Sequence, residues 1–286
     1  MKLILHKAME NLDICSELLR GCRALLIGSG AGMGVDSGLP DFRGKEGFWR
    51  AYPILKKLDL KFEEMANPRW FHEDPTLAWG FYGHRLQLYQ KTYPHPGYQL
   101  VKKWTEKRSL PSFAFTSNVD GHFRKAGWSN QLLECHGSLM YLQCLGQCGH
   151  PIWEIPSGMA DTMVISSESL RCISPLPSCP ECGSVARPNI LMFSDFFRDS
   201  SILNHQEEQL STWLEKNANQ GLLIMEFGAG LSVPTVRSFC ESVKANYECG
   251  MIRVNPRDYH VPAGAYGLPC GALDAIELLN AKIEAG

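Results

Sequence analysis

With 286 residues, of which 44% are hydrophobic, the chain is long enough to bury one large core or two smaller ones. A formal net charge of −2 gives no electrostatic reason to expect binding to nucleic acid or to an anionic membrane. No apolar run approaches the roughly 20 residues of a membrane span, and charge returns at Lys7 too early for a secretory signal, so we expect a soluble, cytoplasmic protein.

The first predicted strand, Ala24–Ile27, runs directly into a segment with glycine at positions 28, 30, 32 and 34. Glycines let the backbone of a strand-to-helix turn approach a diphosphate closely. Met33 stands where the common dinucleotide fingerprint has its third glycine, so a tight connection without a ligand is the alternative. The next loop favours a nucleotide, because Pro40 stiffens it, Phe42 can cover a ring and Arg43 can reach a phosphate or carboxylate.

Two insertions interrupt the predicted sheet. Residues 45–93 are rich in aromatic residues and leucine, and Asn67-Pro68 and Asp74-Pro75 mark helix starts. Residues 139–186 hold a cluster of cysteines among many glycines, prolines and serines. We therefore predict a large sheet domain from residues 1–44, 94–138 and 187–286, and a small composite domain from the two insertions.

A second buried strand, Phe113–Thr116, ends in polar residues that include Asn118 and Asp120. An amide and a carboxylate two residues apart can together satisfy the acceptor and the donors of a carboxamide. An Asx turn that caps the following helix is the alternative interpretation of the same residues.

One histidine stands apart from the other eight. His136 follows a short apolar run and precedes Gly137, which lets a ligand or backbone approach closely. A histidine can accept a proton at neutral pH, so His136 is a candidate general base. We expect most of the other histidines to be surface or packing residues.

The second insertion contains two close pairs of cysteines: Cys144, Cys148, Cys179 and Cys182. Paired knuckles of this kind supply four thiolates to a tetrahedral zinc ion, and four protein ligands close the site to water, so the metal would be structural. His150 and Cys172 are substitute ligands, and a loop of free cysteines is the alternative to a metal site.

Two later apolar runs, Leu222–Phe227 and Met251–Val254, also end in glycine-rich or polar loops. Helical patterns such as Glu207–Lys216 and Thr235–Ala245 separate the strands. Alternating strands and helices predict a parallel α/β sheet, whose ligands bind outside the carboxyl ends of the strands. The loops after all four strands should therefore meet at one crevice.

In this order the motifs resemble those of the sirtuin family. The matching segments are Gly30-Ala31-Gly32 through Gly38-Leu39-Pro40-Asp41-Phe42-Arg43, Thr116-Ser117-Asn118-Val119-Asp120-Gly121, His136-Gly137-Ser138, the four cysteines, Gly228-Ala229-Gly230-Leu231-Ser232-Val233-Pro234 and Val254-Asn255. The resemblance implies a Rossmann-like NAD-binding domain with a smaller domain of a zinc module and a helical insertion. It also implies NAD-dependent transfer of an acyl group from a protein or peptide lysine to ADP-ribose, with release of nicotinamide.

The resemblance further implies a role for each matching position. His136 would deprotonate a ribose hydroxyl, Asn118 and Asp120 would hold the carboxamide, Phe42 would shield the ring, and Arg43 would orient the ribose-phosphate region. The remaining positions at which it implies contacts with NAD are Gly30, Ala31, Gly32, Pro40, Asp41, Ser117, Val119, Gly228, Ala229, Gly230, Asn255 and Cys270.

Tyr82 and Arg85 resemble the Tyr-x-x-Arg pair by which some sirtuins recognise succinyl and malonyl groups. Residues three apart share one face of a helix, so the two side chains can grip one carboxylate jointly. The alternative is an amphipathic helix whose arginine is solvated.

Three departures from the family pattern motivate other functions. Gly34 replaces a serine, Ser117 replaces a glutamine, and Phe193-Ser194-Asp195 replaces a Phe-Gly-Glu motif. An altered groove for the substrate peptide favours an ADP-ribosyltransferase or an NAD hydrolase, and lost polar contacts near the ribose favour a weakly active NAD-binding sensor.

Overall fold

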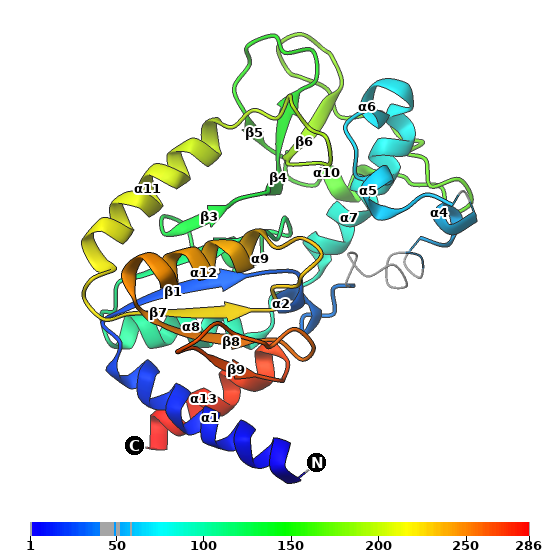
Figure 1. Cartoon of the computed structure of the whole chain (residues 1–286). Helices are drawn as coiled ribbons and strands as arrows, with labels where there is room; N and C mark the ends of the chain where they lie inside the picture. The colour runs from blue at the N-terminus through cyan, green and yellow to red at the C-terminus, as the bar shows by residue number, and fades with distance from the viewer. Residues whose placement is uncertain (1, 41–48, 50–51, 58, 286) are drawn as a thin grey trace.

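The computed structural model describes residues 2–40, 49, 52–57 and 59–285. A six-stranded sheet lies between helices on both faces, and a three-stranded sheet with a group of helices lies beyond one of its edges (Figure 1). The sequence-predicted residues Asp41, Phe42 and Arg43 lie outside the described residues. Within the described ranges, no helix is both long and apolar enough to cross a lipid bilayer.

All strands of the large sheet run parallel, in the order β3-β2-β1-β7-β8-β9. Its members are β1 (Ala24–Ser29), β2 (Ser112–Thr116), β3 (Leu132–Glu134), β7 (Leu222–Phe227), β8 (Gly250–Val254) and β9 (Tyr266–Leu268). The chain reverses its direction of travel across the sheet between β1 and β7, and this switch point leaves a crevice between the loops that follow them. The predicted parallel α/β sheet and its four strands are confirmed. The short strands β3 and β9 were not predicted.

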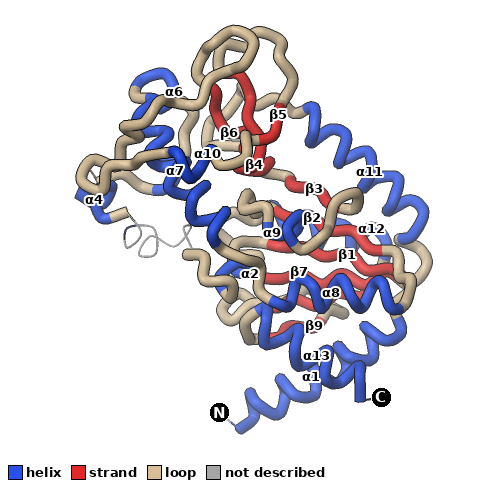
Figure 2. The backbone as a smooth tube through the Cα atoms, turned by 180° about the vertical axis from the view of Figure 1, so that it is seen from behind, coloured by secondary structure: helices blue, strands red, loops and turns tan. Residues whose placement is uncertain are grey.

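Five of the six strands supply side chains to two separate cores, and β9 supplies them to one. Leu25 and Ile27 of β1 pack in the core on one face, while Ala24 and Leu26 pack in the core on the other. The first core is covered by α1 (Lys2–Gly21), α8 (Pro96–Lys107) and α13 (Ala272–Ala285). In Figure 2, α8 crosses in front of the sheet, and α1 and α13 lie below it. The second is covered by α11 (Ser201–Asn217) and α12 (Thr235–Tyr247). This strict alternation explains why the central strands read as continuous apolar runs.

The two insertions pack against each other. The antiparallel sheet has the order β5-β4-β6, with β4 (Gly137–Cys144), β5 (Trp153–Glu154) and β6 (Ala186–Ile190). Around it lie α10 (Met159–Thr162), α4 (Pro53–Lys57), α5 (Phe62–Met65), α6 (Trp70–Glu73) and α7 (Pro75–Lys91). Trp79 of α7 shares an apolar core with Leu142 of β4, and its indole nitrogen donates to the Ala186 carbonyl at 2.8 Å. The division into two domains at the boundaries given above stays a prediction.

Helix α7 begins where the Asp74-Pro75 pair predicts. The Asp74 carboxylate accepts hydrogen bonds from the backbone nitrogen of Leu77 at 3.0 Å and from the Thr76 hydroxyl at 2.7 Å, and it pairs with Arg171. Burial raises the pKa of Asp74, but these hydrogen bonds and the nearby guanidinium outweigh burial and lower it.

We expect Asp74→Ala to lower the free energy of unfolding by about 1 kcal/mol at pH 7, because it leaves the first turn of α7 without its cap. The pKa of Asp74 is lower in the folded protein than in the unfolded chain. The ionised carboxylate therefore contributes its full stability above the unfolded pKa, and this contribution is lost as the pH falls through the folded pKa. Urea unfolding at several pH values should show the gap between the two proteins narrowing below about pH 4. Asp74→Asn keeps an acceptor for the Leu77 nitrogen but lacks the charge, so its stability at pH 7 should lie between those of the wild type and Asp74→Ala. Equal stability of wild type and Asp74→Ala at pH 7 would contradict the cap.

Candidate functional site

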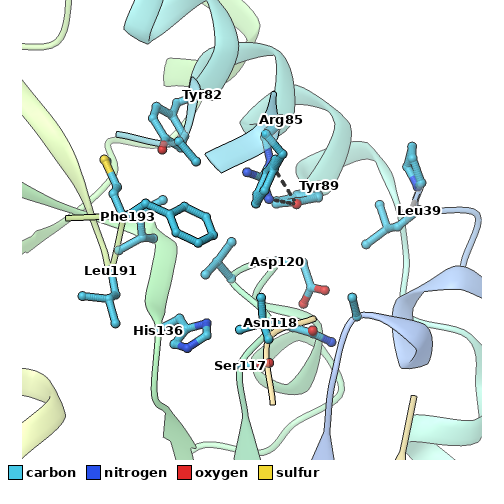
Figure 3. Close-up of a pocket in the computed structure, with 18 residues that line it drawn as sticks. Leu39, Tyr82, Arg85, Tyr89, Ser117, Asn118, Asp120, His136, Leu191 and Phe193 are labelled. Atoms are coloured by element: carbon cyan, nitrogen blue, oxygen red, sulfur yellow. Dashed lines mark hydrogen bonds between the residues drawn. The ribbon is translucent and has the colours of Figure 1, made fainter. Parts of the chain in front are cut away.

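A cavity of about 260 Å³ lies at the carboxyl ends of the strands, between the large sheet and helix α7 (Figure 3). Nine of the sequence-predicted site residues line it: Ala31, Pro40, Tyr82, Arg85, Ser117, Asn118, Val119, Asp120 and His136. In Figure 3, Ser117, Asn118 and His136 lie on one side, and Tyr82 and Arg85 lie across from them on α7. The cavity therefore has a sheet-side end, formed by loops, and a helix-side end, formed by α7.

The glycine-rich loop after β1, which continues into the short helix α2 (Gly32–Val35), packs directly on the loop after β7. The backbone nitrogen of Gly32 donates to the Gly228 carbonyl at 3.0 Å. A Cβ atom added at Gly32 would lie 2.6 Å from the Cα of Gly228, and one at Gly30 would lie 2.7 Å from the Gly228 carbonyl oxygen. Gly228 itself has φ of 60°, in the left-handed region. These glycines are therefore required to bring the two loops together at the switch point.

Asn118 and Asp120 each make a local hydrogen bond as well as lining the cavity. The Asn118 amide donates to the Gly30 carbonyl at 2.9 Å and so ties the loop after β2 to the glycine-rich loop. The Asp120 carboxylate accepts from the backbone nitrogen of His122 at 2.9 Å, which is the Asx turn, at the start of α9 (His122–Lys125). The Asx turn therefore holds a carboxylate at the cavity wall, and the two interpretations of this motif are compatible.

His136 lies between β3 and β4 and is half-buried. Its Nε2 atom lies 3.4 Å from the Thr235 hydroxyl, at the first residue of α12, and its carbonyl accepts from the backbone nitrogen of Leu191 at 2.8 Å. Gly137 has φ of 73°, and a Cβ there would lie 2.1 Å from the Asn189 carbonyl oxygen. The glycine is thus needed for β4 to start beside β6. Thr235 directly follows the motif of residues 228–234, and no separate feature of the sequence predicted it as a site residue.

Arg85 and Tyr82 are both buried, at 6% and 1% exposure. The alternative of a solvated arginine on an amphipathic helix is therefore wrong. Burial disfavours the charged form of Arg85, but the hydroxyls of Tyr89 and Tyr52 outweigh burial and raise its pKa, so the guanidinium stays charged. Burial also raises the pKa of Tyr82, so its hydroxyl is neutral. Within the described part of the chain, that buried hydroxyl has no hydrogen-bond partner.

The four cysteines meet where β4 ends and β6 begins. Their sulfur atoms all lie within 4.8 Å of one another, with the Cys144 and Cys182 sulfurs 3.5 Å apart and the Cys148 and Cys179 sulfurs 3.6 Å apart. A tetrahedral zinc with bonds of about 2.3 Å sets its sulfur ligands roughly 3.8 Å apart, so the donor set fits this ion. Of the two substitute ligands, His150 packs on the Trp153 ring and Cys172 contacts Ser174, and neither joins the cluster.

A loop after β6 forms the outer wall of the cavity. Arg187 and Asp195 form a buried, bidentate ion pair that anchors this loop. The Nη1 and Nη2 atoms of Arg187 donate to the two carboxylate oxygens of Asp195, at 3.0 and 2.5 Å. Ser194, at the position where the resembling motif has glycine, has φ of 58°, a conformation that glycine adopts without strain. The substituted motif therefore keeps a tightly held loop, with Leu191 and Phe193 facing the cavity (Figure 3).

The remaining predicted contacts of the nucleotide lie around the loops after β7, β8 and β9. Asn255 donates to the Ala229 carbonyl at 3.0 Å, next to Gly230. Cys270 follows β9 and packs against the apolar core, and burial, with Asp274 and Asp36 nearby, raises its pKa to about 11. Neither residue lines the cavity itself.

The fold and the site define an α/β protein of the Rossmann type, with a ligand cavity beside the switch point of its sheet and an appended four-cysteine module. Residues 30–214 match the model of the Sir2 family. The chain belongs to this family, and the resemblance to sirtuins is confirmed.

Curated relatives carry the name NAD-dependent protein deacylase. The relative from Aeropyrum pernix is 31% identical over 68% of this chain and 69% of its own length. The relative from Thermococcus kodakarensis is 32% identical over 64% of this chain, and the match spans 65% of that protein. The mitochondrial deacylase sirtuin-5 of the dog is 30% identical over 71% of this chain and 66% of its length.

Solved structures of Sir2 homologues share the fold. A complex of one homologue with NAD has a TM-score of 0.71 at 24% identity, covering 96% of this chain and 94% of the other. A complex of a mutant homologue with ADP-ribose has a TM-score of 0.69 at 24% identity, over 95% and 96% of the two chains.

Proposed function

We propose that the protein is an NAD-dependent protein-lysine deacylase, which transfers the acyl group to ADP-ribose and releases nicotinamide. The observation that carries this proposal is one cavity, lined by His136, Asn118 and Asp120, at the switch point of a Sir2-family chain. The relatives named as NAD-dependent deacylases and the homologue solved with NAD support it.

The residues on the sheet side of the cavity fit NAD. The close packing of Gly30 and Gly32 on Gly228 places two glycine-rich loops together at the switch point, where a diphosphate would bind, and Asn118 and Asp120 offer donors and acceptors for a carboxamide. When bound, NAD supplies the ribose carbon that loses nicotinamide and takes the acyl oxygen. His136 would accept a proton from a ribose hydroxyl, and Leu191 and Phe193 of the outer loop line the cavity together with it.

We propose Phe42 and Arg43 as further NAD contacts from the resemblance alone, because they lie outside the described residues. The contacts assigned to Asn255 and Cys270 have the same basis. The four cysteines hold a structural zinc, since their number, spacing and geometry suit no open catalytic position. The expected cytoplasmic location, and the expectation that nucleic acid and membranes are not partners, stay predictions.

Succinyl and malonyl groups are the substrates that best suit the helix-side end of the cavity. A buried guanidinium and a buried phenol hydroxyl, Arg85 and Tyr82, line that end together. A carboxylate would accept hydrogen bonds from both groups, and it would give the buried Tyr82 hydroxyl a partner. An acetyl group offers neither interaction.

The function is tested by incubating the protein with NAD and peptides that carry acetyl-, succinyl- or malonyl-lysine. Mass spectrometry of the products separates the candidates. Acyl-ADP-ribose with free lysine supports the deacylase. Modified protein or free ADP-ribose alone would instead show the ADP-ribosyltransferase or NAD hydrolase, and no turnover would show a sensor.

Arg85→Met should lower kcat/KM for succinyl-lysine by roughly 10- to 100-fold, because a hydrogen bond to a charged group is worth about 1.5–3 kcal/mol. The same variant should change kcat/KM for acetyl-lysine by less than about threefold, since that substrate makes no ion pair. Steady-state assays on the two peptides measure the ratio. Equal losses on both substrates would rule out the assignment of Arg85 to the acyl carboxylate.

A further inference from the structure

Arg85 is held in place by Tyr89, one helical turn further along α7. The Nε and Nη2 atoms of Arg85 both donate to the Tyr89 hydroxyl, at 3.1 and 2.7 Å (Figure 3). Tyr89 is 4% exposed and lines the same cavity. Two donors of one rigid guanidinium that share one oxygen fix both the position of the group and the tilt of its plane.

Three aromatic rings also contact the Arg85 guanidinium. The central carbon of the guanidinium lies 5.4 Å from the ring centre of Phe81, 5.5 Å from that of Tyr89 and 5.7 Å from that of Phe62. Such contacts stabilise a cation, and like the phenol hydroxyl they carry no negative charge. Tyr89 therefore orients the arginine without neutralising it, whereas an aspartate or glutamate in its place would compete with an anionic ligand.

Tyr89 is itself anchored to the sheet side of the cavity. The Lys125 ammonium donates to the carbonyl of Tyr89 at 2.6 Å and to those of Gln90 and Thr92 at 3.1 Å. A cation among the last carbonyls of a helix is favourable, and it fixes the end of α7. Lys125 belongs to α9, which follows directly on the loop with Asn118 and Asp120. Lys125 thus connects the position of Tyr89 to the loop that is proposed to hold the carboxamide.

We propose that Tyr89 is a positioning residue that sets the preference for acidic acyl groups by holding the Arg85 guanidinium ready for a carboxylate. The proposal rests on the proposed recognition of succinyl and malonyl groups by Arg85 and Tyr82. An arginine side chain loses rotamer entropy when it is fixed, and Tyr89 fixes that of Arg85 before the substrate binds.

The test compares binding of two peptides that are identical except for a succinyl or an acetyl group on the central lysine. Fluorescence anisotropy without NAD gives the dissociation constants, so the result does not depend on turnover. Tyr89→Phe should weaken binding of the succinyl peptide about tenfold and leave the acetyl peptide within about twofold, because only the former uses the oriented guanidinium. Where turnover is measured, KM for the succinyl peptide should rise while kcat stays unchanged.

Tyr141→Phe is the matched control. It also removes the hydroxyl of a tyrosine whose ring lies under an arginine, with the Arg124 carbon 5.4 Å from the ring centre, but Tyr141 does not line the cavity. It should leave the ratio of the two dissociation constants unchanged. If Tyr89→Phe proves unstable by thermal unfolding, Tyr89→Leu removes the same hydroxyl and allows the same comparison.

The outcomes separate this inference from the function on which it rests. If Arg85→Met abolishes the preference for the succinyl peptide and Tyr89→Phe keeps it, the role of Tyr89 is overturned. If the wild type has no such preference, both this role and acidic-acyl recognition are overturned, whereas turnover of the acetyl peptide would still support a deacylase. A preference that Tyr89→Phe abolishes, in a protein without turnover, would support the inference and overturn the deacylase.

Discussion

His136→Ala is expected to lower the rate of acyl transfer by roughly 10²- to 10⁴-fold, the usual contribution of a general base. The imidazole is half-buried and lines the cavity, and its Nε2 atom lies 3.4 Å from the Thr235 hydroxyl. Since no apolar core is built on it, the variant should fold. Single-turnover assays with NAD and an acyl-lysine peptide measure the loss, and thermal unfolding checks the fold.

The control for this prediction is His205→Ala, on the exposed face of α11. The His205 ring bonds to the Gln209 side chain in the next turn and does not line the cavity, so its loss should leave the rate unchanged. Thr235→Val asks whether the threonine hydroxyl orients the imidazole, and a drop in kcat without a change in peptide binding would show that it does. A His136→Ala protein with wild-type rates would rule out His136 as the base.

Removing the zinc is expected to unfold the three-stranded sheet and to lower the melting temperature by on the order of 10 °C. The ion would join the end of β4 to the turn before β6. Both strands supply side chains to the apolar core that they share with α7. Because β4 starts directly after His136 and Asn189 of β6 contacts Gly137, loss of this sheet should also remove activity.

Cys179→Ser tests the metal most directly, because Cys179 is buried and belongs to the cluster. Cys172→Ser is the matched control, since Cys172 is also buried in this part of the chain but contacts Ser174 outside the cluster. Elemental analysis should find one zinc per chain in the wild type and in Cys172→Ser, and none in Cys179→Ser. Folded wild-type protein without zinc would disprove the four-thiolate site.

Much of the large sheet could be predicted because its central strands are buried on both faces. Ala24–Ile27 and Leu222–Phe227 read as unbroken apolar runs for that reason. The edge strands β3 and β9 have three residues each, too few for any period to emerge. The loops after the central strands were expected to meet, because carboxyl ends of parallel strands share one edge, and they do so around Gly32 and Gly228.

The sequence by itself determined the features that depend on residues close along the chain. Such features are the cysteine pairs, the Asp74 cap and the Asx turn at Asp120. In each of them the partners lie within a few positions, so the spacing of residue types predicts the interaction. The sequence also identified the family, because its motifs keep their order along the chain.

Only the tertiary structure decided how Arg85 behaves. Whether an arginine on a helix is solvated or buried depends on what packs over that helix, and here segments distant along the chain cover it. The approach of Thr235 to His136, which are 99 positions apart in the sequence, became visible once α12 and the two sheets were in place. Side chains that meet across a fold carry no local pattern, because their contact is set by packing rather than by spacing.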